Sequence, residues 1–114
     1  MIDLIVGIGI DTVEISRMAQ SLAIPSFLIS TFTPDEIANE HGNREEYYAT
    51  RFACKEAVYK ALGIQFDWRM VETLNRDDGS PYIVMREEYG NVRIHISITT
   101  EGGLATAFCV VEGI

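Results

Sequence analysis

The sequence has 114 residues, of which 47% are apolar and 23% charged, so we expect one ordinary globular domain spanning residues 1–114. A net charge of −8 argues against general binding to nucleic acids or anionic membranes, because both need a dominant positive field. No apolar run is long enough to cross a membrane, no basic signal-peptide start is present, and Cys54 and Cys109 lack CxxC spacing, so we expect a cytoplasmic protein with two buried thiols.

The chain begins with a predicted strand. Residues 2–10 are nearly all apolar and many are β-branched, which is typical of a buried strand. The run ends at Asp11, and residues 12–22 then have the pattern of a short helix. Because strand ends often carry functional groups, Asp11 is a candidate site residue. The structural alternative is that Asp11 only caps the following helix.

Two further helices are predicted. Thr33-Pro34-Asp35-Glu36 is a capping box with proline at the first helical position, and this helix should end near Gly42. Residues 45–62 form the strongest helical pattern, and Gly63 stands where a C-terminal cap is expected.

From residue 70 onward, apolar and polar residues alternate as in strands. We expect strands at 70–75, 82–86, 92–99 and 104–112, with turns at 77–81 and 101–103. Strands joined by such short turns pair antiparallel, as a meander. The sequence therefore predicts an α+β fold in which an antiparallel sheet packs against a long buried helix and shorter helices.

Glu56 is the most unusual residue of the long predicted helix. At about 100° per residue it shares a stripe with Phe52, Ala53 and Lys60, where an isolated carboxylate is costly to bury. Lys60, four residues on, could compensate it as a plain structural ion pair. A divalent cation is the other candidate, because Mg²⁺ is commonly held by one or two carboxylates with phosphate oxygens and waters. Asp11 and Glu56 could supply that pair.

Basic residues are concentrated in the same region. Only Arg17 is basic among residues 1–43, whereas Arg44, Arg51, Lys55 and Lys60 follow within 17 positions. Such a cluster on an acidic chain indicates a small anionic ligand, such as a phosphorylated compound. A solvated helix face is the commoner explanation of a basic cluster.

Several segments together resemble one known family. They are Gly7-Ile8-Gly9-Ile10-Asp11 with Arg17, Arg51-Phe52-Ala53-Cys54-Lys55-Glu56-Ala57 with Lys60, Gly79-Ser80-Pro81, and His95-Ile96-Ser97-Ile98-Thr99. In this order and spacing the chain resembles the holo-acyl-carrier-protein synthases, which are 4′-phosphopantetheinyl transferases. Proteins of this family move the 4′-phosphopantetheine group of coenzyme A to a serine of an apo-acyl carrier protein and release adenosine 3′,5′-bisphosphate.

The resemblance implies roles for individual residues. Asp11 and Glu56 would bind Mg²⁺, and Lys60 would help to position Glu56 and the phosphate oxygens. Coenzyme A would be held by the residues Arg51, Arg44, Gly79 and Pro81. Arg17 would meet the carrier protein, and the protein would be a homotrimer with active sites between subunits. The sequence leaves the general base open between Glu56 and a water on the metal.

Three positions depart from the family pattern. Thr100 stands where relatives usually have histidine, Ser80 where lysine is common, and Arg17 is the only base on a helix that is often more basic. Weak attraction to a free acidic carrier raises the hypothesis that the acceptor is a carrier domain tethered in a fatty-acid or polyketide synthase.

Two other functions are compatible with these residues. A non-catalytic carrier-binding relative could have lost turnover together with the histidine at position 100. An unrelated α+β metal enzyme could act on another phosphorylated compound. Retention of Asp11, Glu56 and Lys60 favours the transferase.

Overall fold

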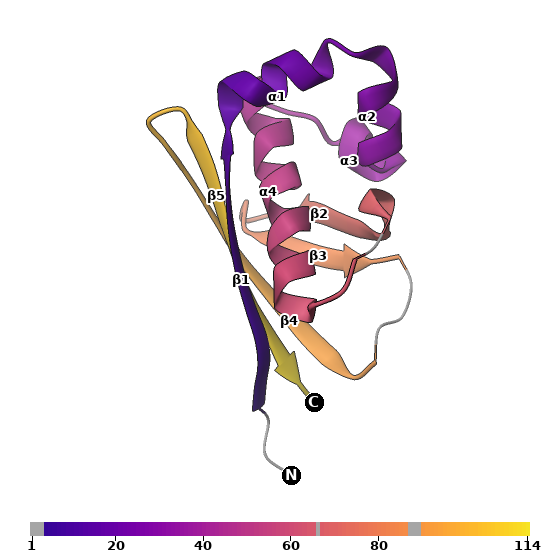
Figure 1. Ribbon diagram of the computed structural model, residues 1–114, viewed down its shortest axis with the longest axis vertical. Coiled ribbons are helices and arrows are strands. Elements are labelled where there is room, and N and C mark those ends of the chain that lie inside the picture. Colours follow the sequence, from indigo (N-terminus) through magenta and orange to yellow (C-terminus); the bar gives the residue numbers. More distant parts are fainter. Residues whose placement is uncertain (1–3, 66, 87–89) are drawn as a thin grey trace.

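The computed structural model describes residues 4–65, 67–86 and 90–114 and shows one long helix lying against a sheet (Figure 1). The helices and strands follow in chain order: β1 (Leu4–Glu14), α1 (Ile15–Leu22), α2 (Pro25–Thr31), α3 (Pro34–Ala38), α4 (Arg44–Leu62), the 3₁₀ turn η1 (Trp68–Met70), β2 (Val71–Asn75), β3 (Pro81–Met85), β4 (Val92–Glu101) and β5 (Leu104–Gly113). None of the helices in these ranges is long and apolar enough to cross a membrane.

The strands form two antiparallel sheets. One has the order β1-β5-β4, and the other contains only β2 and β3. Helix α4 packs on β1 and β5 and also contacts β2 and β4, while α1 to α3 gather at its N-terminal end (Figure 1). The predicted α+β architecture is confirmed. The predicted antiparallel pairs β2-β3 and β4-β5 are confirmed, but they do not form one meander, because β3 belongs to a different sheet from β4.

Strand β1 lies unusually close to α4. A Cβ atom built on Gly9 would be 2.1 Å from the carbonyl oxygen of Ala57, and one built on Gly7 would be 1.7 Å from that of Ala61. Such separations are far inside van der Waals contact, so only glycine fits at these two positions. The close approach brings the second half of β1 alongside the middle of α4.

The beginning of the chain differs from its prediction. The strand does not end before Asp11 but continues to Glu14, paired with β5 as far as Leu104. The next helix therefore starts at Ile15 with Glu14 as N-cap, and Asp11 has no capping role. Of the predicted strand, residues 2 and 3 lie outside the described residues.

The expected burial of β1 is also wrong for this chain. Its inward side carries the glycines against α4, and its other side is exposed, with Ile8 62% and Ile10 57% accessible. The outward side chains of β5 continue this surface, since Val110 and Phe108 lie opposite those two isoleucines. The outer side of β1 and β5 is therefore largely apolar and uncovered by the described residues, whereas β4 presents polar side chains such as Arg93 and His95 on this face.

The helices agree better with the sequence. Helix α4 begins one residue earlier than predicted, with Asn43 as N-cap, and Gly63 ends it with a left-handed φ of 73°. The capping box of Thr33 and Glu36 is present. Helix α3 ends at Ala38 rather than near Gly42, and α2 is an additional helix that begins at Pro25.

A buried ion pair joins α3, α4 and β2. Lys55 Nζ lies 2.7 Å from Glu36 Oε1 with both side chains fully buried, and it also donates to the carbonyl oxygens of Trp68 and Val71. The other oxygen of Glu36 accepts from the Thr73 backbone at 3.0 Å. Because each ammonium hydrogen has an acceptor, the two charges are compensated inside the protein.

Candidate active site

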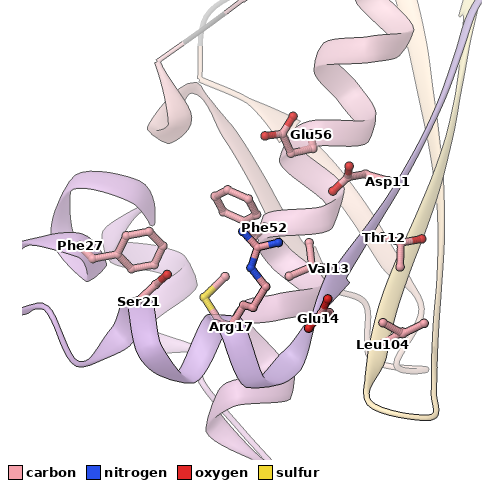
Figure 2. Close-up of a pocket in the computed structure, with 11 residues that line it drawn as sticks. Asp11, Thr12, Val13, Glu14, Arg17, Ser21, Phe27, Phe52, Glu56 and Leu104 are labelled. Carbon is pink, nitrogen blue, oxygen red and sulfur yellow. The ribbon is translucent and has the colours of Figure 1, made fainter.

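A pocket of about 450 Å³ opens between β1, α1 and α4, and both predicted metal ligands line it. Asp11 comes from β1 and Glu56 from α4, and Figure 2 shows the two carboxylates side by side at one end of the pocket. Arg17 extends from α1 toward the same space, and Phe27 and Phe52 form an apolar wall. Two residues that are 45 positions apart in the sequence are thus brought together as predicted.

The charges around Glu56 perturb its protonation. Burial raises the pKa of Glu56, the Asp11 carboxylate raises it further, and Lys60 partly offsets both effects. The neighbouring negative charge disfavours the ionised form, just as partial removal from water does. A site in which two carboxylates destabilise each other is one in which a cation is favoured.

Lys60 takes a different partner from the one considered in the sequence. Its Nζ atom donates to the carbonyl oxygen of Ile10 at 2.9 Å and lies 3.2 Å from Asp11 Oδ1. The simple Glu56–Lys60 ion pair is therefore replaced by a bridge from α4 to β1, which helps to hold Asp11 beside Glu56.

The donor set suits a hard divalent cation. Within the described residues, no group of three or more His, Cys, Asp or Glu side chains is arranged to hold a metal ion, so Asp11 and Glu56 would act as a pair. One or two carboxylates, completed by phosphate oxygens and waters, form the usual environment of Mg²⁺. The pair therefore fits a metal that binds together with a phosphorylated ligand.

Three of the four residues predicted to bind coenzyme A meet in a second pocket, of about 320 Å³. Arg51 comes from α4, and Gly79 and Pro81 come from the turn between β2 and β3 and the start of β3. Gly79 has a left-handed φ of 89°, so the turn requires glycine there. Thr100, at the position of the missing histidine, lines the same pocket.

Arg44 lies elsewhere, with its Nε 3.5 Å from Glu40 Oε1 and its guanidinium over the ring of Tyr48. Ser80, where a lysine is common, is engaged by Asp78 through its backbone and hydroxyl groups. Neither residue lines the second pocket.

The two pockets of one chain share no lining residue. The predicted metal ligands line one, and the predicted nucleotide residues line the other. Sequence reasoning missed Asn75, whose side chain contacts Arg51 in the second pocket. Its contact with Arg51 spans 24 positions, so no local pattern in the sequence indicates it.

The cysteines are buried, as predicted. Both side chains are inaccessible in the core between α4 and β5, and burial raises the pKa of Cys54 to about 11. A thiol with this pKa is almost entirely protonated at neutral pH and is a poor nucleophile.

Comparison with known proteins gives one consistent result. The sequence profile of the 4′-phosphopantetheinyl transferase superfamily matches residues 7–109. The chain is 36% identical over 118 residues to the holo-[acyl-carrier-protein] synthase of Shouchella clausii, covering 96% of this chain and 99% of the relative. It is 36% identical over 121 residues to the enzyme of the same name from Fusobacterium nucleatum, with 95% and 99% covered.

A solved structure is similar over the same range. The holo-(acyl-carrier-protein) synthase of Bacillus anthracis, in complex with CoA (3′,5′-ADP), superposes with a TM-score of 0.85 at 32% identity, covering 96% of this chain and 98% of that protein.

Proposed function

The chain belongs to the 4′-phosphopantetheinyl transferase superfamily, and we propose that its active site combines the Asp11–Glu56 pocket of one copy with the Arg51 pocket of a neighbouring copy. The enzyme transfers 4′-phosphopantetheine from coenzyme A to acyl carrier protein. The serine oxygen of the carrier forms a bond to the pantetheine-side phosphorus, and the bond from this phosphorus to the bridging oxygen breaks. Adenosine 3′,5′-bisphosphate leaves with that oxygen.

Asp11 and Glu56 are the proposed ligands of Mg²⁺, which when bound neutralises charge on the pyrophosphate. Lys60 keeps Asp11 in place through its bond to Asp11 Oδ1 and supplies a second positive charge at the same end of the pocket. As a ligand of the metal, Glu56 would be ionised and so able to accept a proton. We assign to Glu56 the uptake of the serine proton.

The Arg51 pocket is the proposed site of the nucleotide. Arg51 presents a guanidinium to phosphate oxygens, and Gly79 and Pro81 offer a narrow, uncharged surface to the adenine. Arg44 is left out of this assignment, because its guanidinium is engaged at Glu40 and Tyr48.

A homotrimer would explain why the predicted metal ligands and nucleotide residues line separate pockets of one chain. It would also explain why the outer side of β1 and β5 is exposed in a single copy. The outward side chains of β1 and β5 form a patch of large apolar residues that includes Ile5, Ile8, Ile10 and Phe108. Apolar surface of this kind is stabilised when another copy covers it. Closing three copies around the patch could bring the first pocket of each to the second pocket of the next.

The proposed acceptor is a carrier domain tethered to a larger synthase in the cytoplasm. The chain carries a net charge of −8, and Arg17 is the only basic residue of α1, so long-range attraction to a free acidic carrier is weak. A tether replaces that attraction with high local concentration. Rates measured on the same carrier, free and within its synthase, test this assignment, and a clear preference for the free carrier contradicts it.

The decisive experiment follows the carrier by mass. Incubation with coenzyme A, Mg²⁺ and several apo-carriers should add one phosphopantetheine group to a carrier serine, and Asp11→Ala or Glu56→Gln should abolish the addition. Glu45→Gln makes the same chemical change at a partly exposed position of α4, away from both pockets, and should retain activity. Coenzyme A binding without transfer to any carrier would contradict the proposed chemistry.

A further inference from the structure

Arg51 is held in position by neutral groups alone. Its side chain is 5% exposed; Nη1 donates to Thr50 Oγ1 at 3.0 Å, Nη2 donates to Asn75 Oδ1, and the guanidinium lies 4.0 Å from the centre of the Tyr47 ring. No ion pair joins it to a carboxylate in the described part of the chain. Its Nε is buried and has no hydrogen-bond partner in that same part.

A buried cation without a counter-ion is costly to the folded protein. The usual solution is a carboxylate partner, as for Lys55 and Glu36 in this same protein. Arg51 instead lines the second pocket with its full charge available. An anion that enters the pocket would compensate this charge and so offset the cost.

Asn75 has two contacts that few other side chains could make together. Its Oδ1 accepts from Arg51, and its Nδ2 donates to the carbonyl oxygen of Gly79 at 2.9 Å. The orientation of the carboxamide is fixed by its partners, because a guanidinium can only donate and a carbonyl can only accept. The side chain thus links α4 to the turn that carries Gly79 and Pro81.

We propose that Asn75 is a positioning residue that fixes Arg51 and the Gly79 turn as one unit while leaving the arginine charge uncompensated for the phosphate of coenzyme A. This inference rests on the function proposed above. Asparagine supplies a neutral acceptor, whereas an aspartate would accept from Arg51 equally well but would neutralise it and lose the bond to Gly79.

The test compares Asn75→Asp with Asn75→Ala by calorimetric titration of adenosine 3′,5′-bisphosphate. We expect Asn75→Asp to weaken binding on the order of tenfold or more, and Asn75→Ala to weaken it less, because alanine frees the guanidinium without neutralising it. Turnover at saturating coenzyme A and carrier should stay near that of the unmodified enzyme, so the effect appears in KM. Asn91→Asp, the same change at an exposed position before β4, should bind normally.

If the role of Asn75 is purely structural, the affinities of the two variants should rank in the opposite order. Aspartate keeps the acceptor that holds Arg51, so Asn75→Asp would then bind at least as well as Asn75→Ala, and this result would overturn the proposal. In an Arg51→Gln background, Asn75→Asp should change binding by less than about twofold, since its effect acts through the arginine. An equal loss in both backgrounds would also overturn it.

Melting curves recorded for each variant separate lost binding from lost folding. If Asn75→Asp is unfolded at the assay temperature, Asn75→Ala is used instead, alone and combined with Arg51→Gln. A loss of affinity in the double variant equal to the sum of the two single losses would count against the proposal. Binding and transfer by the unmodified protein test the proposed function. The ranking of the variants tests only the role of Asn75.

Discussion

Glu56 shows how a single side chain can be predicted as unusual before its partner is known. The helical pattern placed a carboxylate among apolar residues, and the structure adds Asp11 from a distant strand beside it. Lys60, expected to compensate Glu56 directly, contacts Asp11 instead. The pattern of one helix could indicate an electrostatic cost but could not show how another element would meet it.

Magnesium binding should depend on the protonation of Glu56. Because its pKa is raised above the ordinary value, the free protein holds a proton on Glu56 at pH values where a free glutamate is ionised, and a metal must displace it. Affinity for Mg²⁺ in the presence of adenosine 3′,5′-bisphosphate should therefore rise with pH through this window and level off above it. Calorimetry in buffers of different ionisation enthalpy should detect proton release.

The raised pKa of Glu56 affects folding stability in the opposite direction, so that stability falls as pH rises. Because the folded pKa is the higher one, the neutral acid favours folding at low pH, and this contribution is lost as pH rises through the folded pKa. Glu56→Gln should remove both the proton release and this pH dependence, whereas Glu45→Gln should keep them. Unchanged proton release in Glu56→Gln would assign the titration to another group.

At the scale of elements, the buried pair of Lys55 and Glu36 joins α4, α3 and β2. Lys55→Met should lower the free energy of unfolding by about 3 kcal/mol, because it leaves Glu36 as an uncompensated buried charge. Adding Glu36→Gln should recover part of the loss. Urea denaturation measures the free energy of unfolding of the single and the double variant. Equal decreases in the two would show that the carboxylate charge of Glu36 is not the cause.

The contact of β1 with α4 offers a second test. Gly9→Ala should destabilise the protein by about 1–3 kcal/mol and weaken Mg²⁺ binding, because the new methyl group overlaps the Ala57 carbonyl and separates Asp11 from Glu56. Gly113→Ala is the matched control, since its Cβ would meet only a Val6 methyl group at 3.3 Å and the Leu4 carbonyl oxygen at 3.8 Å. Metal titration with thermal unfolding distinguishes them, and equal behaviour of the two variants would contradict the predicted displacement.

The elements differ in how well the sequence predicted them, for physical reasons. Helix α4 and the capping box at Thr33 rest on local hydrogen bonds, so their residues specify them directly. Helix α2 has only seven residues and no clear apolar period, and its packing supplies what local preference does not. The end of β1 depends on pairing with β5, a partner roughly 90 positions away along the chain.

For the whole molecule, the outer face of the β1-β5-β4 sheet is the dominant feature that one copy does not explain. The apolar run at residues 2–10 predicted burial, but the glycines face the helix and the large side chains face outward. A sequence pattern cannot distinguish burial within a chain from burial between chains. The metal and nucleotide residues were predicted to serve one site at a subunit interface, but no pattern in the sequence indicated that they line separate pockets of one chain.

The proposed trimer predicts complementation between impaired variants. Assayed at low coenzyme A, Glu56→Gln and Arg51→Gln should each be almost inactive alone, but copies mixed after unfolding and refolding should recover about a quarter of the native activity, since one site in four would receive both intact halves. Phe108→Asp should give a monomer without activity, as judged by light scattering during gel filtration. A mixture that stays inactive, or an active monomer, would contradict a shared site.

The antiparallel pairing of β1 with β5 has a consequence for connectivity, because Leu4 lies opposite Gly113 at the same end of the sheet. A short linker between these neighbouring positions would make the backbone circular without disturbing either strand. New termini could then be opened at the exposed loop around Gly42, where the backbone is not part of a helix or strand. In such a rearranged polypeptide, Asp11 would follow Glu56 along the chain, while the pocket that both residues line would be unchanged.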